Sequence, residues 1–126
     1  MPEEKLIISV RQPNPFVGVL DIQGAITSFN EKTLVDAYSQ ALIGRLRVII
    51  LNFSRMSYIN SLGIGMLVTL LIRARREGVT LAGYGLNQHY SQVFQITRLD
   101  QAIPLYGNES TAIAYSAPMD LPEREY

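Results

Sequence analysis

The chain has 126 residues, of which 48% are hydrophobic and 17% charged, so it is long enough for one domain with its own hydrophobic core. Eleven basic residues balance eleven acidic ones, and this neutral balance argues against a nucleic-acid partner or an anionic membrane surface. The sequence contains no cysteine, which excludes disulfides and thiolate metal sites and is typical of a reducing cytosol.

The N-terminus, M-P-E-E-K, lacks the apolar core of a signal peptide. The densest apolar stretch, residues 62–72, is far shorter than the ~20 apolar residues that span a bilayer. We therefore expect a soluble, cytoplasmic protein that does not insert directly into a membrane.

The first third of the chain predicts a hairpin followed by a helix. Residues 5–11 and 16–23 have the patterning of strands, and the Q-P-N-P segment between them is typical of a turn. Ser28 and Glu31 have the spacing of a capping box, which places the start of a helix after Ser28. Gly44 is expected to end this helix. Its apolar stripe comprises Leu34, Val35, Tyr38, Ala41 and Leu42.

The middle of the chain predicts a strand, a helix and a second strand. Residues 46–53 contain the run V-I-I-L, which is typical of a strand covered on both faces and is expected at the centre of a sheet. Residues 61–77 predict a helix that stops at Gly78, and residues 79–82 predict a short strand. Such a unit predicts two parallel strands joined by a right-handed crossover.

The last third predicts a helix at residues 88–97, a short strand at 102–106 and a short helix at 110–115. The complete order predicts an α/β fold, with a mixed sheet of four to five strands and helices mainly on one face. We expect a single domain over residues 1–115. Residues 116–126, which hold two prolines and four charges, are expected to form a flexible tail.

A polar pair, Asn60 and Ser61, opens the predicted helix at residues 61–77. The surrounding segment N-F-S-R-M-S-Y-I-N-S-L-G-I-G-M-L resembles the signature of the STAS domain family, in which Asp-Ser-x-Gly-hydrophobic-Gly follows a strand. Three further segments resemble the family at the right distances: D-I-Q-G, R-A-R-R-E-G-V-T-L-A-G and F-Q-I-T-R-L-D. The resemblance spans residues 5–115 and rests on the ordered set of four segments.

This resemblance implies a STAS fold and the role of a bacterial anti-sigma factor antagonist, which regulates transcription by binding a partner protein. In that family an anti-sigma factor of the histidine-kinase-like ATPase type phosphorylates the Ser that follows the motif's Asp. The unphosphorylated antagonist binds this kinase and frees the sigma factor, and the phosphorylated antagonist does not. Carried over by motif, the phosphoacceptor is Ser61.

Two positions depart from the family's pattern. The motif's Asp is Asn60 in this chain, and an Asp that some antagonists carry after the second strand is Thr27. Both changes remove negative charge from the expected partner-facing edge, which also includes Ser28. They favour an alternative, a STAS module that is not switched by phosphate and serves as a constitutive scaffold or as the small subunit of a membrane transport complex.

The residues themselves also indicate a site at Ser61. A helix start exposes unpaired N–H groups and a partial positive charge, and Gly63 and Gly65 leave room for a partner's backbone to approach. Asn and Ser are also ordinary helix caps, so a purely structural interpretation stays open. A further alternative is a small-ligand or nucleotide-binding module that uses this helix terminus as an anion site.

The predicted helix at residues 61–77 has a broad apolar face that we expect to cover the sheet. This face comprises Ile64, Leu67, Val68, Leu70, Leu71, Ile72 and Ala74. Leu62 and Met66 lie outside it, one turn apart, on the face expected to point to solvent. We expect these two residues to form the apolar centre of a partner interface, with Thr69 and Arg73 at its rim.

The residues offer no catalytic constellation. His89 is the only histidine, so Ser61 has at most one candidate base for a triad. The G-Y-G segment at 83–85 lacks the third glycine of a dinucleotide loop, and no P-loop is present. We therefore expect a binding protein rather than an enzyme, with no cofactor and no metal site. A homodimer is left open.

Overall fold

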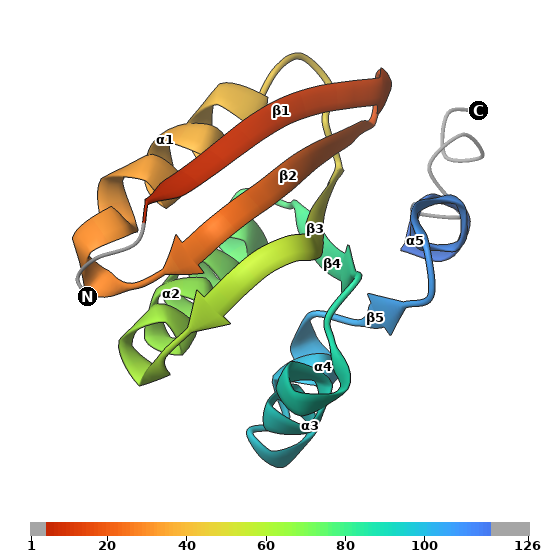
Figure 1. Ribbon diagram of the computed structural model, residues 1–126. Coiled ribbons are helices and arrows are strands. Elements are labelled where there is room, and N and C mark those ends of the chain that lie inside the picture. The colour runs from red at the N-terminus through yellow and green to blue at the C-terminus, as the bar shows by residue number, and fades with distance from the viewer. Residues whose placement is uncertain (1–4, 117–126) are drawn as a thin grey trace.

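The computed structural model describes residues 5–116, which form a five-stranded mixed sheet with helices mainly on one face (Figure 1). The strands are β1 (Leu6–Asn14), β2 (Val17–Ile26), β3 (Val48–Ile59), β4 (Thr80–Tyr84) and β5 (Leu105–Tyr106). The helices are α1 (Glu31–Ala41), α2 (Ser61–Arg76), α3 (Gln88–Ile96), α4 (Leu99–Ala102) and α5 (Glu109–Ser116). A 3-10 turn, η1 (Ser28–Asn30), separates β2 from α1. The predicted fold class is confirmed. Of the predicted tail, all but Ser116 falls outside the described residues.

The strands follow one another in chain order across the sheet. β1 and β2 pair antiparallel as the predicted hairpin, and each later neighbouring pair is parallel. β3 therefore lies at the centre, and residues 48–51 are fully buried within it, as the V-I-I-L run predicts.

Alternate residues of this central run contribute to two hydrophobic clusters on opposite faces of the sheet. Ile49 and Leu51 pack in the larger cluster, under α1, α2 and α3, and Val48 and Ile50 pack in the smaller one with Ala112 of α5. Figure 1 shows α1 and α2 side by side behind the strands. A strand with period-two side chains can be apolar on both faces only where both faces are covered.

β3 is longer than the predicted strand, which ended at Phe53. Its second half continues to pair with β2 as far as Ile26 and Ile59, through two irregularities in the register. These irregularities interrupt the alternation of buried and exposed residues. Because a strand is predicted from that alternation, the sequence does not indicate the second half of β3. A short helix, α4, also occupies part of the range expected for the last strand, so β5 has only two residues.

The predicted capping box at Ser28 and Glu31 is wrong. Ser28 lies in η1, whose cap is Thr27, and α1 begins only at Glu31 without a side-chain cap. The Oγ1 of Thr27 accepts hydrogen bonds from the backbone N–H of Phe29 and from the Asn30 amide, both at 3.3 Å. Thr27 thus organises the turn instead of Ser28.

The buried face of α2 is narrower than predicted. Val68 and Ile72, expected to cover the sheet, are 38% and 53% exposed. The buried residues of α2 are Gly63, Leu67, Leu70, Leu71 and Ala74, so the helix is rotated with its first turn pressed against the sheet at Gly63. This contact fixes which stripe of the helix faces inward.

Candidate functional site

The loops that leave β2 and β3 lie side by side at one edge of the sheet. The two strands are parallel, and their last paired residues are Ile26 and Ile59. Since the chain continues from these residues into η1 and α2, Thr27 and Asn60 occupy corresponding places next to each other. The sheet therefore brings together segments that are far apart in sequence, at the carboxyl ends of two parallel strands.

Asn60 is the N-cap of α2. Its Oδ1 accepts a hydrogen bond from the backbone N–H of Gly63 at 2.9 Å, and its backbone carbonyl accepts from Ile64 N at 2.9 Å. An aspartate would supply the same acceptor, so the change from the family's Asp keeps the cap and removes only the charge.

Ser61 is the first residue of α2 and its side chain is exposed. The helix therefore begins at the residue where the sequence predicts its start. The hydroxyl lies where the unpaired N–H groups and partial positive charge of a 16-residue helix are concentrated. An anionic group attached here meets a favourable local field.

Gly63 does not face a partner, contrary to the expectation from the sequence. It is buried, and a Cβ at this position would lie 2.2 Å from the carbonyl oxygen of Ile26 and 2.8 Å from Ile59 Cγ1. The glycine is required because the first turn of α2 crosses the end of β2 at close range. Gly65, in contrast, lies on the open surface, where a Cβ would meet no atom within 4 Å.

Thr27 is only 8% exposed, so its side chain organises the turn rather than contacting a partner. Ser28 is exposed beside it. No sequence pattern points to Phe29, which follows them and is 75% exposed. A phenylalanine is more often buried in a core, and only the tertiary arrangement shows that this one is exposed.

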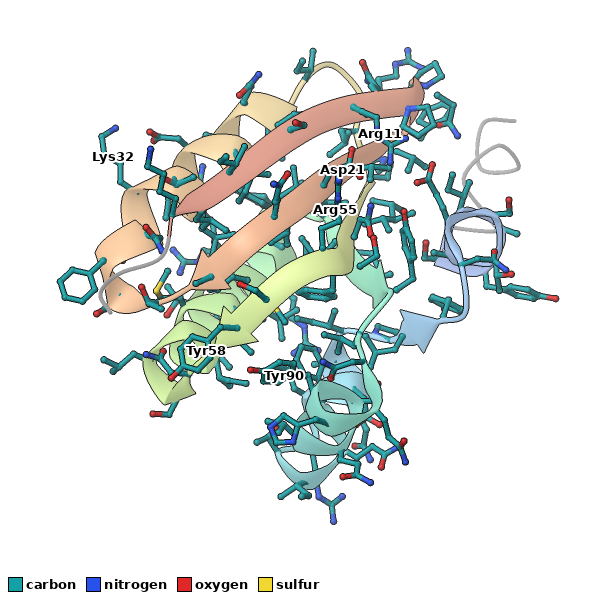
Figure 2. The ribbon with its side chains drawn as sticks, in the orientation of Figure 1. Arg11, Asp21, Lys32, Arg55, Tyr58 and Tyr90 are labelled. Atoms are coloured by element: carbon teal, nitrogen blue, oxygen red, sulfur yellow. The ribbon has the colours of Figure 1, made fainter. Side chains whose placement is uncertain are left out.

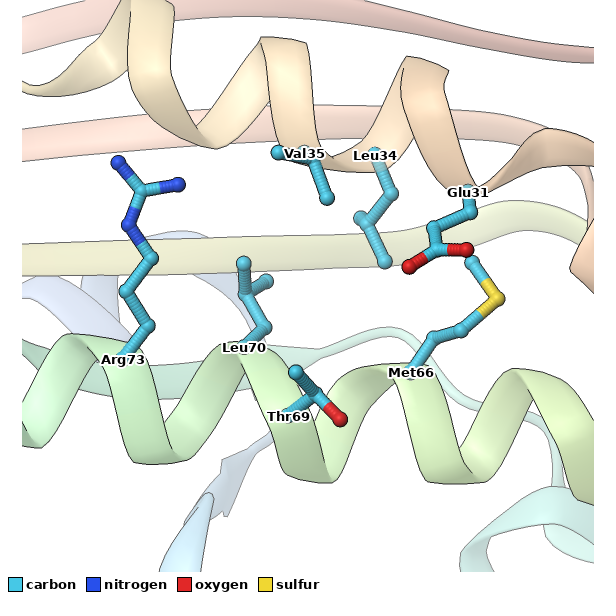
Figure 3. A pocket seen from close by; sticks show the side chains of 7 residues that line it. All are labelled: Glu31, Leu34, Val35, Met66, Thr69, Leu70 and Arg73. Atoms are coloured by element: carbon cyan, nitrogen blue, oxygen red, sulfur yellow. The ribbon is translucent and has the colours of Figure 1, made fainter.

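Leu62 is 61% exposed, as predicted, but Met66 is not its outward-facing neighbour. Met66 is half-buried, and its side chain points into the groove between α1 and α2 (Figure 3). The exposed apolar residue next to Ser61 is therefore Leu62. Of the predicted rim, Thr69 is exposed and Arg73 is half-buried.

The fold and the polar helix start are matched by a known protein family. Residues 8–112 match the family model of the STAS domain. The chain belongs to the STAS domain family. No curated protein matches this STAS domain in sequence.

Solved structures with the same fold include anti-sigma factor antagonists and a sulfate transporter family protein. The STAS domain superimposes on an anti-sigma factor antagonist from Mycobacterium paratuberculosis with a TM-score of 0.76 at 17% identity, covering 90% of this chain and 96% of that one. The Bacillus cell fate determinant SpoIIAA, in its phosphorylated form, gives 0.65 at 19% identity over 86% and 97%. A sulfate transporter family protein from Wolinella succinogenes gives 0.67 at 18% identity over 79% and 84%. At these identities the likeness establishes the shared fold.

A hydrogen bond next to the site and a charged network away from it brace the sheet of the STAS domain. Tyr90 of α3 accepts a hydrogen bond from the backbone N–H of Ile59 at 3.5 Å, directly before Asn60. On the opposite face of the sheet, Arg11 lies beside Asp21 (Figure 2) and donates to it at 2.5 and 2.9 Å. Arg11 also donates to Glu109 at 2.7 and 3.2 Å. This network was not predicted, because it joins β1, β2 and α5.

The network shifts the protonation of its members. The Arg11 hydrogen bonds hold the pKa values of Asp21 and Glu109 below their usual range, against the opposing effect of burial. Asn52 also donates to Asp21 at 2.7 Å. Burial and a hydrogen bond to Glu109 raise the pKa of Tyr84 to about 12. The network thus ties α5 to the sheet through charged groups.

Within residues 5–116, no cluster of three or more His, Cys, Asp or Glu residues could hold a metal ion. None of the helices in the same range is long and apolar enough to cross a membrane. The site at the start of α2 itself is made of uncharged residues: Thr27, Ser28, Phe29, Asn30, Asn60, Ser61 and Leu62.

Proposed function

We propose that this STAS domain is a partner-switching regulator of the anti-sigma factor antagonist type, which acts by binding rather than by catalysis. Its partner is an anti-sigma factor of the histidine-kinase-like ATPase type, and phosphate on Ser61 releases that partner. The observation that carries the proposal is the exposed Ser61 at the first position of α2, next to the exposed side chain of Leu62.

The chemistry of the site supports a switch. A phosphoserine adds about −1.5 to −2 charge and three acceptor oxygens. The positive end of α2 stabilises this charge in the free protein. In a complex the same charge lies at the interface next to the exposed Leu62, where its desolvation costs several kcal/mol unless the partner supplies a cation. Phosphate therefore leaves the fold intact and weakens the interface.

The structural neighbours agree with this proposal in one respect. SpoIIAA was solved in a phosphorylated form, so a protein of this fold accepts a phosphate. The proposal extends to a role in transcription regulation in the bacterial cytoplasm, because the partner class acts there.

A second candidate function is a STAS module that phosphate does not switch, such as a scaffold or the small subunit of a transport complex. The observation that favours it is Asn60, which provides the helix cap without the family's carboxylate. The neighbour from the sulfate transporter family has the same fold in a different setting.

Phosphopeptide mapping by mass spectrometry on the chain purified from its own organism separates the two candidates. The switching proposal predicts phosphate on Ser61, absent from Ser61→Ala and retained in Ser28→Ala, which alters the exposed serine of the adjacent loop. A chain that carries no phosphate at Ser61 under any growth condition, while still binding its partner, supports the scaffold.

A further inference from the structure

A small apolar slot lies between α1 and α2, one helical turn beyond Leu62 (Figure 3). It has a volume of about 60 Å³. Its lining residues are Glu31, Leu34, Val35, Met66, Thr69, Leu70 and Arg73. We call it the α1–α2 slot.

The floor and the ends of the α1–α2 slot differ in character. Leu34 and Leu70 are buried and form an aliphatic floor, while Val35 and Thr69 form its open lips. Figure 3 shows the Glu31 carboxylate beside Met66 at one end and Arg73 at the other end. The slot is therefore apolar in the middle, with a negative charge at the end near Ser61 and a positive charge at the far end.

The far end is held in a fixed position. The guanidinium of Arg73 lies over the ring of Tyr38, 4.7 Å from its centroid, and Arg73 Nε donates to Glu77 at 3.3 Å. Tyr38, itself buried, donates its hydroxyl hydrogen to the same Glu77 carboxylate at 2.8 Å. These contacts keep the slot open at the far end, since Arg73 cannot fold down over Leu70 without breaking them.

The size of the slot limits what it accepts. Pockets for small-molecule ligands generally measure about 300 to 1,000 Å³, and the slot, at about 60 Å³, is far smaller. It matches the end of one aliphatic side chain. One end of the slot, at Met66, lies one helical turn from Leu62 along α2.

We propose that the α1–α2 slot receives one aliphatic side chain from a segment of the partner protein, and that a lysine or arginine of the same segment pairs with Glu31. This inference deepens the proposed function, on which it rests for the identity of the partner. Glu31 is exposed at the slot's mouth on the side of Ser61, so a basic residue there approaches without burial. The slot selects which partner segment binds, whereas phosphate on Ser61 controls whether the partner binds.

The test pans a random peptide library displayed on phage against the full chain and measures the affinity of selected peptides for variants. We expect enriched peptides to hold a leucine, isoleucine or methionine close to a basic residue. Thr69→Tyr fills the slot from its lip and should weaken binding about tenfold or more. Val68→Tyr, an exposed change on the same helix outside the slot, is the matched control and should leave affinity unchanged.

Glu31→Gln should weaken the same peptides about two- to fivefold, since an exposed ion pair contributes about 0.5 to 1 kcal/mol. Selected peptides that bind Thr69→Tyr as well as the original chain, or a library that yields no binder sensitive to Thr69→Tyr, would overturn the proposal. The assay does not involve phosphate on Ser61. Its failure therefore leaves the proposed function standing, and a chain that is never phosphorylated leaves the slot result standing.

Discussion

At the scale of single residues, the two glycines at the start of α2 have opposite roles although the sequence makes them look alike. Gly63 lies against the main chain of β2, and Gly65 faces open space. The close approach at Gly63 is what places Ser61 at the edge of the sheet. A glycine that serves packing cannot be told from one that serves a partner by spacing alone, which is why the sequence-based expectation for Gly63 was wrong.

Replacing each glycine by alanine separates these roles. Gly63→Ala should lower the free energy of unfolding by about 1 to 3 kcal/mol, because its Cβ collides with the Ile26 carbonyl and the helix must shift. Gly65→Ala should raise it by up to about 1 kcal/mol, the helix-propensity gain. Urea denaturation of both variants measures the difference. Equal effects would mean that α2 does not cross β2 as closely as described.

Two variants of Asn60 separate the effect of its N-cap hydrogen bond from the effect of the carboxylate charge that the family's Asp carries at this position. Asn60→Ala should cost about 1 kcal/mol of stability, since the Gly63 N–H loses its acceptor. Asn60→Asp should retain full stability, because aspartate caps equally well and its charge is favourable at a helix N-terminus. Thermal unfolding of the two variants provides the measurement, and a destabilised Asn60→Asp would contradict the assigned geometry.

At the scale of elements, the most apolar segments were predictable and the polar ones were not. The V-I-I-L run and the start of α2 follow from local patterns that tertiary structure did not override. The second half of β3, with serines and Arg55 between Phe53 and Ile59, pairs with β2 through register irregularities that sequence periodicity cannot express. The α1–α2 slot and exposed Phe29 likewise depend on contacts between separate elements.

The rotation of α2 is tested by its two neighbouring apolar residues. Met66→Ala should cost about 1 to 2 kcal/mol of stability, because Met66 is partly buried against α1. Leu62→Ala should change stability by less than about 0.5 kcal/mol, because Leu62 faces solvent. The affinity for the partner should change in the opposite order, with a larger loss for Leu62→Ala than for Met66→Ala. If both variants unfold at the same temperature, Met66 is as exposed as Leu62, as the sequence alone suggested.

At the scale of the whole molecule, charged groups on one face of the sheet hold α5 in place, while the proposed partner site lies at the ends of β2 and β3. Arg11 bridges β2 and α5 through Asp21 and Glu109. This arrangement leaves the loops after β2 and β3 free of structural charges. Ser61 stands in one local motif and could be predicted from the sequence. The network joins residues that are far apart in the sequence, so no local pattern indicates it.

The network predicts an acid-sensitive fold. The folded-state pKa values of Asp21 and Glu109 are lowered, so the unfolded chain takes up protons first as the pH falls. Their contribution to stability is complete above the ordinary carboxyl pKa of about 4 and is lost as the pH falls through the lower folded-state values. Glu109→Gln should be slightly less stable at neutral pH and should lose less stability on acidification. Urea unfolding between neutral pH and pH ~3 measures this, and a steeper acid loss in Glu109→Gln would contradict it.

In the proposed switch, charge at Ser61 controls partner binding without disturbing the fold. The most direct measurement is the dissociation constant of the partner ATPase, recovered by affinity capture on the unmodified chain, for the original protein, Ser61→Asp and the control Ser28→Asp. We predict that Ser61→Asp weakens binding by about 30-fold or more, equivalent to about 2 kcal/mol, with an unchanged melting temperature, while Ser28→Asp has a much smaller effect. Equal affinity of Ser61→Asp and the original protein would contradict the switch and leave the constitutive scaffold as the function of this domain.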